Sequence, residues 1–537
     1  MAKKYIYQDI PYFENFRQML SMAVDSGNTA FKFRENGKIR EVSYKEFKDT
    51  TIYLGTELYD MGYLSSHVAC IGPNSYKWIV IYMTMLNSNG VFVPIDKELP
   101  FCDIVNVLNH GDVKVLFYSE KYKEELMANL DKFPNVEKLI CTDDLEFEEM
   151  IVKGKLKYEI GNAGYEKSVG DMDVLRVLVY TSGTTGMPKG VMLSERNIAS
   201  CIYHGMRTTK LYGSCLSVLP YHHTYEMCGF LASMNKHATI CINENLKTVL
   251  KNLKVYSPEY IFLVPAFLEK FYKKIVAVGG KKLVIALKVS NALRKVGIDL
   301  RGTLFKTVHK TFGGNLKKIV SGGAALRSEI SKFFNDIGIT LVNGYGITEC
   351  SPLVCMSREG FNDYDNVGLP IPCLKIKIAD ADSNGIGEVS VKSPSVMMGY
   401  YKDEERTNEV LIDGWYHTGD YGYLDAENRL HITGRKKNMI PLNSGKNVFP
   451  EEIENYILLI DYVAEVVVRA VTDDAGIATG LYAEVFLGEG APENDAKSQL
   501  MKDIKAVLKE LPAYKQVSRV EIRDTEFVKT TTNKIKR

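Results

Sequence analysis

Short apolar runs alternate with helical patterns through the first two-thirds of this 537-residue chain, and this alternation constrains the fold more than any other feature. Helical patterns at residues 76–87 and 101–109 lie between such runs. Strands and helices that alternate in this way build parallel sheets covered by helices. The sequence therefore predicts an α/β fold. The apolar runs read as buried strands are residues 68–71, 91–95, 115–118 and 138–141.

The length of the chain and the character of its C-terminal part predict a second domain. A chain of 537 residues is longer than one hydrophobic core usually supports. Residues 441–450 are rich in Pro, Asn, Ser and Gly, and a small α/β pattern follows them. We expect a large domain at residues 1–434 and a small one at 435–537. In the small domain we expect helices from about residue 450 and at 496–508, and strands at 464–469 and 481–487.

The composition is that of a soluble globular protein, with 45% hydrophobic and 25% charged residues. The formal net charge of +1 gives no overall attraction to nucleic acid or to an anionic membrane. Ten cysteines are scattered without a C-x-x-C pair, which argues against a zinc site or disulfide framework and favours a reducing compartment. Neither a signal peptide nor a membrane-spanning apolar run is recognisable. We expect a cytoplasmic protein without a nucleic-acid partner.

A loop rich in glycine and hydroxyl side chains, Y-T-S-G-T-T-G-M-P-K-G-V at residues 180–191, follows an apolar run at 174–179. Glycine lets backbone N–H groups turn toward an anion, and Ser or Thr hydroxyls add donors or reach a metal ion. Counted from Gly183, Pro188 stands where a Walker A loop needs its second glycine, so this phosphate loop is of another kind. The residues predicted to bind phosphate are Thr181, Ser182, Gly183, Thr184, Thr185, Gly186 and Lys189.

The order T-S-G-T-T-G-x-P-K-G resembles the signature of the adenylate-forming (AMP-binding) superfamily, which includes acyl-CoA synthetases, luciferases and adenylation domains of peptide synthetases. Four further segments resemble that superfamily in its order, and the likeness covers about residues 20–537. It implies a large domain of parallel and mixed sheets flanked by helices, a β-barrel-like subdomain and a small mobile α+β domain. The further segments are 219–226, 321–326 with 343–349, 414–420 and 434–440.

The resemblance implies an ATP site with a magnesium ion. Tyr345 offers a face on which a base can stack, and glycines let the backbone approach a planar ring. Glu349 is a hard oxygen ligand that suits Mg²⁺, and with Thr181 it would hold the ion, while Thr348 would touch the α-phosphate. The residues expected to line adenine are Gly323, Asn343, Gly344 and Tyr345.

Two other segments supply the ribose and acyl contacts that the resemblance implies. Asp420, in G-W-Y-H-T-G-D, would accept the ribose hydroxyls, although such an aspartate could also be a solvated turn residue. Arg435 would add a ribose or phosphate contact, and Lys437 stands where the superfamily pivots its small domain. His223 matches an aromatic residue of the acyl-binding site, although a lone histidine is more often a core or capping residue.

The C-terminal segment F-V-K-T-T-T-N-K-I-K-R resembles the superfamily ending P-K-T-x-x-G-K-I-x-R, which makes Lys534 the catalytic lysine. We expect this tail to be ordered only when it is docked on the nucleotide. Asn533 replaces the usual glycine, and asparagine is among the few residues that tolerate left-handed backbone. Pro441 lies where many relatives carry a lysine.

These residues together imply activation of a carboxylic acid by ATP, with release of pyrophosphate, and transfer of the acyl group to coenzyme A. Within the superfamily the likeness is greatest to bacterial long-chain fatty acid–CoA ligases, which predicts a medium- to long-chain fatty acid. An aryl-acid–CoA ligase or an acyl–carrier-protein ligase is the alternative, and an inactive nucleotide- or lipid-binding homologue is a third. The features that favour the fatty acid are H-H-x-x-E at 222–226, V-P-A-F at 264–267 and G-R-K-K-N at 434–438.

Residues 273–318 carry many lysines and arginines and a single acid, Asp299, with apolar residues at helical spacing. A basic stretch of this kind is often only a solvated helix face. It can also contact anionic lipid or bring in an acyl-bearing substrate. The sequence therefore leaves open a peripheral membrane contact through this segment.

Overall fold

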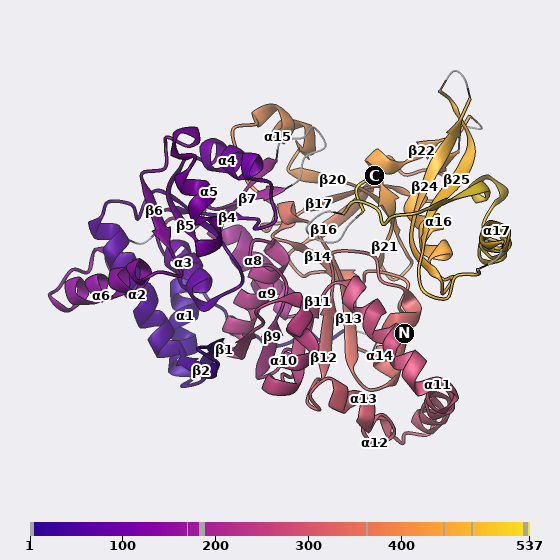
Figure 1. Ribbon diagram of the computed structural model, residues 1–537, viewed down its shortest axis with the longest axis horizontal. Coiled ribbons are helices and arrows are strands. Elements are labelled where there is room, and N and C mark those ends of the chain that lie inside the picture. The colour runs from indigo at the N-terminus through magenta and orange to yellow at the C-terminus, as the bar shows by residue number, and fades with distance from the viewer. Residues whose placement is uncertain are drawn as a thin grey trace. The chain divides into compact units, whose positions relative to one another are not determined.

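The computed structural model describes residues 5–168, 170–181, 188–360, 363–443, 446–473, 476–493, 495–529 and 535–537 (Figure 1). The chain divides into two compact units. The first comprises Met1–Lys375 and Val391–Tyr416, and the second comprises Ile376–Ser390 and His417–Arg537. Both units combine sheets with helices, so the predicted α/β class is confirmed.

One sheet of the first unit has seven strands in the order β18-β8-β7-β4-β3-β5-β6. The five strands from β7 to β6 run parallel, whereas β8 and β18 are antiparallel to their neighbours. All four strands predicted in the first part of the chain belong to this sheet. The strands are β3 (His67–Ile71), β4 (Val91–Ile95), β5 (Val113–Tyr118), β6 (Lys138–Cys141), β7 (Leu175–Thr181), β8 (Lys189–Ser194) and β18 (Gly399–Tyr400).

A second sheet of the first unit has nine strands in the order β15-β14-β13-β12-β11-β9-β10-β1-β2. Its central strands are parallel, and antiparallel strands close both edges. The strands are β1 (Thr29–Glu35), β2 (Lys38–Ser43), β9 (Ser214–Ser217), β10 (Thr239–Ile242), β11 (Tyr260–Leu263), β12 (Lys318–Ser321), β13 (Thr340–Gly346), β14 (Leu353–Met356) and β15 (Leu369–Pro370).

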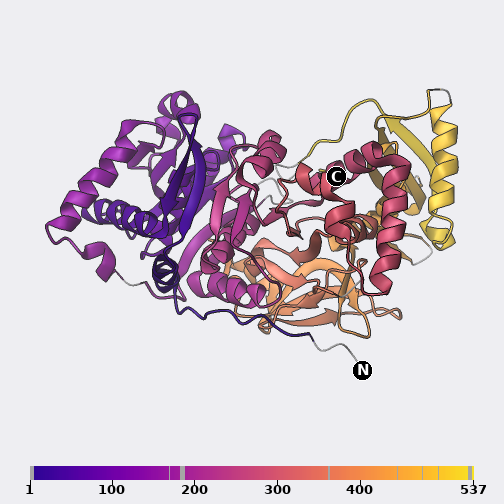
Figure 2. The ribbon, with the colours of Figure 1, turned by 90° about the horizontal axis from the view of Figure 1, so that it is seen from below.

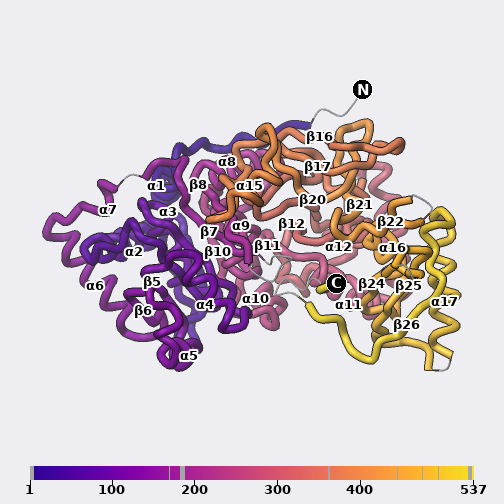
Figure 3. The backbone as a smooth tube through the Cα atoms, turned by 90° about the horizontal axis from the view of Figure 1, so that it is seen from above, coloured from indigo at the N-terminus to yellow at the C-terminus, as the bar shows by residue number. Residues whose placement is uncertain are grey.

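The helices of the first unit cover these two sheets (Figure 1). Helices α2 and α6 lie side by side (Figure 3), where Lys157 is ion-paired with the buried Glu57. The helices are α1 (Phe16–Asp25), α2 (Tyr44–Asp60), α3 (Tyr76–Leu86), α4 (Phe101–His110), α5 (Lys123–Met127), α6 (Leu145–Glu159), α7 (Gly164–Lys167), α8 (Glu195–Met206), α9 (Thr224–Asn235), α10 (Val249–Tyr256), α11 (Pro265–Lys295), α12 (Arg301–Leu304), α13 (Lys306–Thr311), α14 (Ser328–Asp336) and α15 (Glu404–Val410).

The N-terminal segment is extended and runs along the surface of the first unit (Figure 2). The Tyr5 hydroxyl donates to the Thr208 carbonyl over 2.7 Å, and the Gln8 N–H donates to the Arg207 carbonyl over 2.8 Å. These two bonds fix the segment beside the C-terminal end of α8.

A curled half-barrel sheet corresponds to the β-barrel-like subdomain that the resemblance implies. Its strands follow the order β16-β17-β20-β19, and β21 pairs with β20. Strand β20 is long, and its register with β21 sets Asp420 opposite Arg435. The strands are β16 (Lys375–Ala379), β17 (Gly387–Lys392), β19 (Leu411–Ile412), β20 (Trp415–Leu424) and β21 (Leu430–Arg435).

The C-terminal part of the second unit has its own core, built on a three-stranded sheet in the order β24-β25-β26. The two predicted helices and two predicted strands are confirmed. The strand β26 (Val517–Arg523), which runs parallel to β25, was not predicted. The other elements are β22 (Ile440–Pro441), β23 (Asn447–Val448), α16 (Pro450–Ile457), β24 (Val463–Thr472), β25 (Ala478–Leu487) and α17 (Ala496–Val507).

The two compact units do not coincide with the two predicted domains. The second unit includes residues 376–390 and 417–434, which the prediction assigned to the large domain. The predicted boundary at Arg435 was placed beside Lys437, the residue about which the small domain is expected to rotate. Both the boundary and the rotation stay predictions. Within the described residues, no helix is long and apolar enough to cross a membrane.

Candidate active site

The phosphate loop connects two antiparallel strands of the seven-stranded sheet. Strand β7 ends at Thr181 and β8 begins at Lys189, and these two residues stand opposite each other in the register. Residues 176–179 of β7 are buried, so the loop follows a buried strand, as the apolar run at 174–179 indicates. The predicted phosphate ligands Ser182, Gly183, Thr184, Thr185 and Gly186 lie outside the described residues.

Tyr400 connects the end of this loop to the predicted metal ligand. The ammonium nitrogen of Lys189 lies 5.1 Å from the centroid of the Tyr400 ring, and the Tyr400 hydroxyl donates to Oε1 of Glu349 over 3.0 Å. Strand β18 carries Tyr400, and its pairing with β8 holds the ring beside Lys189. Burial raises the pKa of Tyr400, and the Glu349 carboxylate raises it further, so the hydroxyl remains a donor.

Sequence reasoning missed Tyr400 because the residue carries no motif of its own. It lies 51 positions from Glu349 along the chain. The pairing of β18 with β8 brings it to the loop, and a two-residue strand has no recognisable pattern. The aromatic pair Tyr400-Tyr401 after a glycine is the one local signal that could have drawn attention to it.

Glu349 and Thr348 belong to a short 3-10 helix, η4 (Thr348–Cys350), that follows β13. The backbone N–H of Met397 donates to the Glu349 carbonyl over 2.8 Å. Cys350 is fully buried behind the two residues, while Thr348 and Glu349 are half-buried. The carboxylate is therefore anchored through its backbone and keeps oxygen available to a cation, which fits the hard oxygen ligands that Mg²⁺ prefers.

The residues predicted to line adenine lie at the carboxyl ends of the neighbouring strands β12 and β13. In this register Ser321 stands opposite Asn343, and Gly323 follows two residues later with φ of +87°. Asn343 is buried, and its Oδ1 has no hydrogen-bond partner among the described residues. A buried carbonyl oxygen of this kind is costly unless a donor reaches it, and the amino group of adenine is such a donor.

Gly344 and Tyr345 continue β13 into an antiparallel pairing with β14. A Cβ atom at Gly344 would lie 3.3 Å from the Leu353 side chain and 3.4 Å from the Cys355 carbonyl oxygen. The glycine thus keeps the strands in close contact, and Tyr345 is left half-buried at the strand end. The structure therefore brings all four predicted adenine residues together where β12 and β13 of the nine-stranded sheet end.

Asp420 and Arg435, the predicted ribose ligands, form an ion pair in the second unit. They face each other across β20 and β21, with 3.0 Å between Arg435 Nε and Asp420 Oδ1. Asp420 is only 3% exposed, and its backbone N–H donates to the Thr418 hydroxyl. A carboxylate held in this way can accept further hydroxyl donors without changing its position.

His223 is the N-cap residue of α9, which fits the capping role that sequence reasoning kept open, although its side chain makes no capping hydrogen bond. Its ring lies 4.2 Å from the His222 ring, centroid to centroid. The Nε2 atom of His222 is 3.2 Å from Oδ1 of Asp96, which follows strand β4. One ligand atom from each of these three residues lies within 4.8 Å of the others, a cluster that sequence reasoning missed. Its nitrogen donors do not suit Mg²⁺.

The predicted catalytic Lys534 and its neighbour Asn533 lie outside the described residues. The three residues that follow are held by the second unit itself. The Lys536 N–H donates to the Val528 carbonyl over 2.8 Å, and the Arg537 guanidinium is ion-paired with Glu454. Whether the tail becomes ordered only when it is docked on the nucleotide stays a prediction.

Lys437, the predicted pivot, lies in the 3-10 helix η5 (Lys436–Asn438) between β21 and β22. Pro441 ends β22, which pairs with β23. A proline suits this two-residue pairing, since short edge strands tolerate the loss of one donor.

The family model described as "AMP-binding enzyme" matches residues 21–401. Human long-chain-fatty-acid–CoA ligase 1 is 28% identical over an alignment of 507 residues that covers 87% of this chain and 72% of that protein. Long-chain-fatty-acid–CoA ligase FadD15 of Mycobacterium bovis is 29% identical over an alignment of 433 residues that covers 75% of this chain and 70% of that protein.

Solved structures resemble the whole chain at low sequence identity. The anthranilate CoA ligase AuaEII in complex with anthranoyl-AMP has a TM-score of 0.79 at 20% identity, covering 98% of this chain and 96% of that chain. The Mycobacterium tuberculosis fatty acyl CoA synthetase has a TM-score of 0.68 at 21% identity, covering 97% and 96%. At such identities the likeness concerns the fold.

Proposed function

The chain belongs to the family of AMP-binding enzymes, and on that premise we propose that it activates a carboxylic acid with ATP and transfers the acyl group to coenzyme A. The observation that carries this proposal is the link from Lys189 to Glu349 through Tyr400. It brings a cation and a hard carboxylate to the end of one phosphate loop, as binding of a triphosphate with its metal ion requires.

In the first step, a carboxylate oxygen of the acid attacks the α-phosphorus of ATP, and the bond to pyrophosphate breaks. Lys189 and the loop N–H groups would stabilise the charge of the leaving pyrophosphate, and Lys534 would stabilise the charge that develops at the α-phosphate. Thr181 and Glu349 would hold Mg²⁺, which supplies further positive charge to the triphosphate. Asp420 and Arg435 would bind the ribose.

In the second step, the thiol of coenzyme A attacks the acyl carbonyl carbon, and AMP leaves. Lys534 at the adenylate would obstruct the thiol, so we propose that residues 435–537 rotate about Lys437 between the steps. Such a hinge needs a few residues in a loop or at an element end that absorb the backbone change. The short helix η5, between two strands, meets this description.

The proposed acid is a medium- to long-chain fatty acid. Support comes from the two relatives whose names give long-chain fatty acids as substrates, at 28% and 29% identity. An aryl acid is the second candidate, because an anthranilate CoA ligase shares the fold over 98% of this chain. A carrier protein in place of coenzyme A is the alternative acceptor.

Acid-dependent exchange of labelled pyrophosphate into ATP tests the proposal. Acids from acetate to oleate, with benzoates beside them, are compared in one panel. The expected result is exchange that depends on Mg²⁺ and is greatest with the longer fatty acids. Exchange with benzoates alone would replace the fatty acid by an aryl acid, and no exchange with any acid would contradict the proposed activity.

We propose a reducing compartment such as the cytoplasm as the location of the protein, on the basis of the scattered cysteine pattern of the sequence. A long-chain fatty acid partitions into membranes, so the proposed substrate is presented at a lipid surface. Peripheral membrane contact through the basic segment 273–318 is therefore part of the proposal.

A further inference from the structure

The second half of helix α11 presents two parallel rows of side chains to solvent. Gly280, with φ of +48°, interrupts the helix, and the turns after it form a separate stretch. Lysines recur every seven residues there, and aliphatic residues recur at spacings of four and three. Residues with these spacings share one face of a helix. The lysine row is Lys281, Lys288 and Lys295, and the aliphatic row is Ile285, Val289, Ala292 and Val296.

Both rows are exposed. Ile285 is 61% exposed and Val296 is 72% exposed, and the preceding Val278 is 84% exposed. The described residues leave these branched aliphatic side chains largely uncovered, although such side chains are usually found in a core. The lysines of the row form no ion pair with any residue that the structure describes. We name these two rows together the α11 face.

The opposite side of the same turns packs on the protein. Leu283 and Ser290 are buried, with 7% and 1% exposure. Ala286 and Leu287 pack against the core cluster under the nine-stranded sheet. The helix therefore has two apolar sides, and one of them packs on the core. Rotating the helix to bury the α11 face would expose the side that is now packed.

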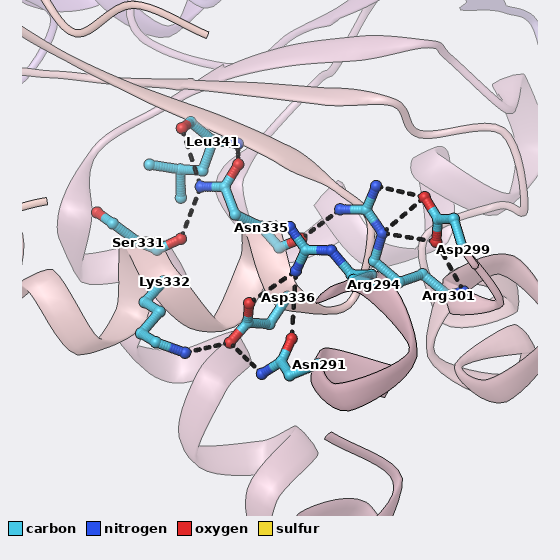
Figure 4. A network of polar contacts seen from close by, with 9 residues as sticks. All are labelled: Asn291, Arg294, Asp299, Arg301, Ser331, Lys332, Asn335, Asp336 and Leu341. Carbon is cyan, nitrogen blue, oxygen red and sulfur yellow. Dashed lines mark hydrogen bonds and ion pairs between the residues drawn. The ribbon is translucent and has the colours of Figure 1, made fainter. Parts of the chain in front are cut away.

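A network of polar contacts fixes this orientation (Figure 4). Asp336, the last residue of α14, accepts hydrogen bonds from Asn291 over 3.0 Å and from Arg294 over 3.1 Å. Lys332 contacts the same carboxylate. Asn291 and Arg294 both lie on the inner side of α11, so the network holds the lysine row and the aliphatic row outward.

The acidic residue in the basic segment does not offset its charge. Asp299 accepts hydrogen bonds from the Arg301 guanidinium, which lowers the pKa of Asp299 to about 2. Arg301 in turn donates to the Asn335 carbonyl over 2.8 Å. Asp299 therefore compensates the charge of Arg301 and not that of the lysines of the α11 face.

We propose that the α11 face docks on the surface of an anionic phospholipid bilayer, with its lysines at the phosphates and its aliphatic row at the acyl boundary. An interfacial helix needs a charged row beside an apolar row, as found here. A protein partner fits less well, because interfaces are enriched in aromatic residues and arginine and depleted in lysine. The choice of lipid rests on the proposed fatty acid substrate, which such a surface would deliver.

Sedimentation with vesicles, using the full chain without ATP or acid, tests this docking. Vesicles of phosphatidylcholine alone are compared with vesicles in which about a third of the lipid is phosphatidylglycerol. Binding is expected only to the anionic vesicles and is expected to weaken with added salt, because exposed charges are screened. Lys281→Glu with Lys288→Glu is expected to lower binding about tenfold or more. Ile285→Ser with Val289→Ser is expected to lower binding to the same vesicles with little change in its salt dependence.

Helix α6 offers matched controls on another surface. Lys153→Glu with Lys155→Glu makes the same charge change, and Val152→Ser with Leu156→Ser removes two aliphatic side chains that are 57% and 58% exposed. Both pairs are expected to leave vesicle binding unchanged. Circular dichroism and the unfolding midpoint verify that every variant is folded.

Three results would overturn the docking: no binding of the unaltered chain to anionic vesicles, equal loss with the α6 pairs, or full binding by both α11 pairs. Acid-dependent pyrophosphate exchange, measured on the same preparations without lipid, keeps the two proposals apart. A chain that binds vesicles and activates no acid would refute the enzymatic proposal and leave the docking intact. A chain that activates fatty acids and ignores vesicles would do the reverse.

Discussion

At the scale of single residues, Tyr400 makes two different contacts. Its ring lies against the Lys189 ammonium group, and its hydroxyl donates a hydrogen bond to Glu349. The two functions can be separated chemically. Phenylalanine keeps the ring and removes the hydroxyl, whereas leucine removes both. Because burial keeps the hydroxyl protonated, its loss removes a hydrogen-bond donor to Glu349 without removing a charge.

Tyr400→Phe should raise the Mg²⁺ concentration needed for half-maximal activity and lower kcat/KM about tenfold. The reason is the lost hydrogen bond to a carboxylate, worth about 1.5 kcal/mol or more. Tyr400→Leu should lower kcat/KM further, because the contact with Lys189 is lost as well. The measurement is kcat/KM for ATP across a series of Mg²⁺ concentrations.

Tyr401→Phe is the matched control, because the Tyr401 hydroxyl donates to Asp112 over 2.6 Å and has no hydrogen bond to a predicted site residue that the structure describes. It should lower stability without changing the Mg²⁺ dependence. The same Mg²⁺ dependence in Tyr400→Phe and the unaltered chain would refute the role of Tyr400.

Glu226 gives the stability of the protein a pH dependence. It is fully buried, which raises its pKa from 4.5 to about 8, although Ser217 donates a hydrogen bond to it. Between these two pH values the unfolded chain releases the proton and the folded chain keeps it. Stability is therefore lost as pH rises from about 4.5 to about 8.

Glu226→Gln removes this titration while keeping the shape of the side chain. The difference in unfolding free energy, variant minus unaltered, should increase by a few kcal/mol between about pH 5 and about pH 8. Urea unfolding at three pH values measures it. A difference that stays constant with pH would contradict the raised pKa.

The sequence could predict the site role of a residue where that residue belongs to a local motif. Thr181 and Lys189 belong to one sequence motif, and the pairing of β7 with β8 sets them opposite each other. Tyr400 and Asp96 reach the site through pairing and packing between distant segments, which one sequence does not reveal. His223 combines both cases. A capping role was among the expectations for it, whereas its spatial proximity to Asp96 was not.

At the scale of elements, the parallel strands were predictable because burial on both faces leaves continuous apolar runs. Strand β26 was missed because its sequence, VSRVEIR, buries only Val517 and Val520 and carries charged residues between and after them. Its place beside β25 depends on tertiary pairing. The orientation of α11 likewise depends on a contact with α14 that no local pattern encodes.

Asp336→Ala should free the second half of α11 from α14. It removes the common acceptor of Asn291 and Arg294 and leaves the partly buried guanidinium without its carboxylate, at a cost of about 2 kcal/mol. Hydrogen exchange of the peptide covering residues 281–295 should accelerate. Urea unfolding and hydrogen–deuterium exchange measure the two effects.

Asp299→Ala, in the same network, is the control. Its carboxylate is 52% exposed and pairs with a residue two positions away, so its loss should cost less than about 1 kcal/mol. Equal effects of the two substitutions would show that Asp336 has no special part in holding α11.

At the scale of the whole molecule, the predicted ligands divide between the two units. Thr181, Lys189 and Glu349 belong to the first, and Asp420 and Arg435 belong to the second. The proposed catalytic lysine, Lys534, also belongs to the second. In the proposed mechanism residues 435–537 move about Lys437, so Lys534 can act in adenylation and withdraw before thioester formation.

The two half-reactions of the Lys534→Ala variant test this account most directly. Adenylation is followed by acid-dependent pyrophosphate exchange, and thioester formation is followed by adding a synthetic acyl adenylate with coenzyme A. The account predicts that adenylation is abolished while thioester formation is largely retained. Equal loss of both half-reactions, or retention of both, would contradict it.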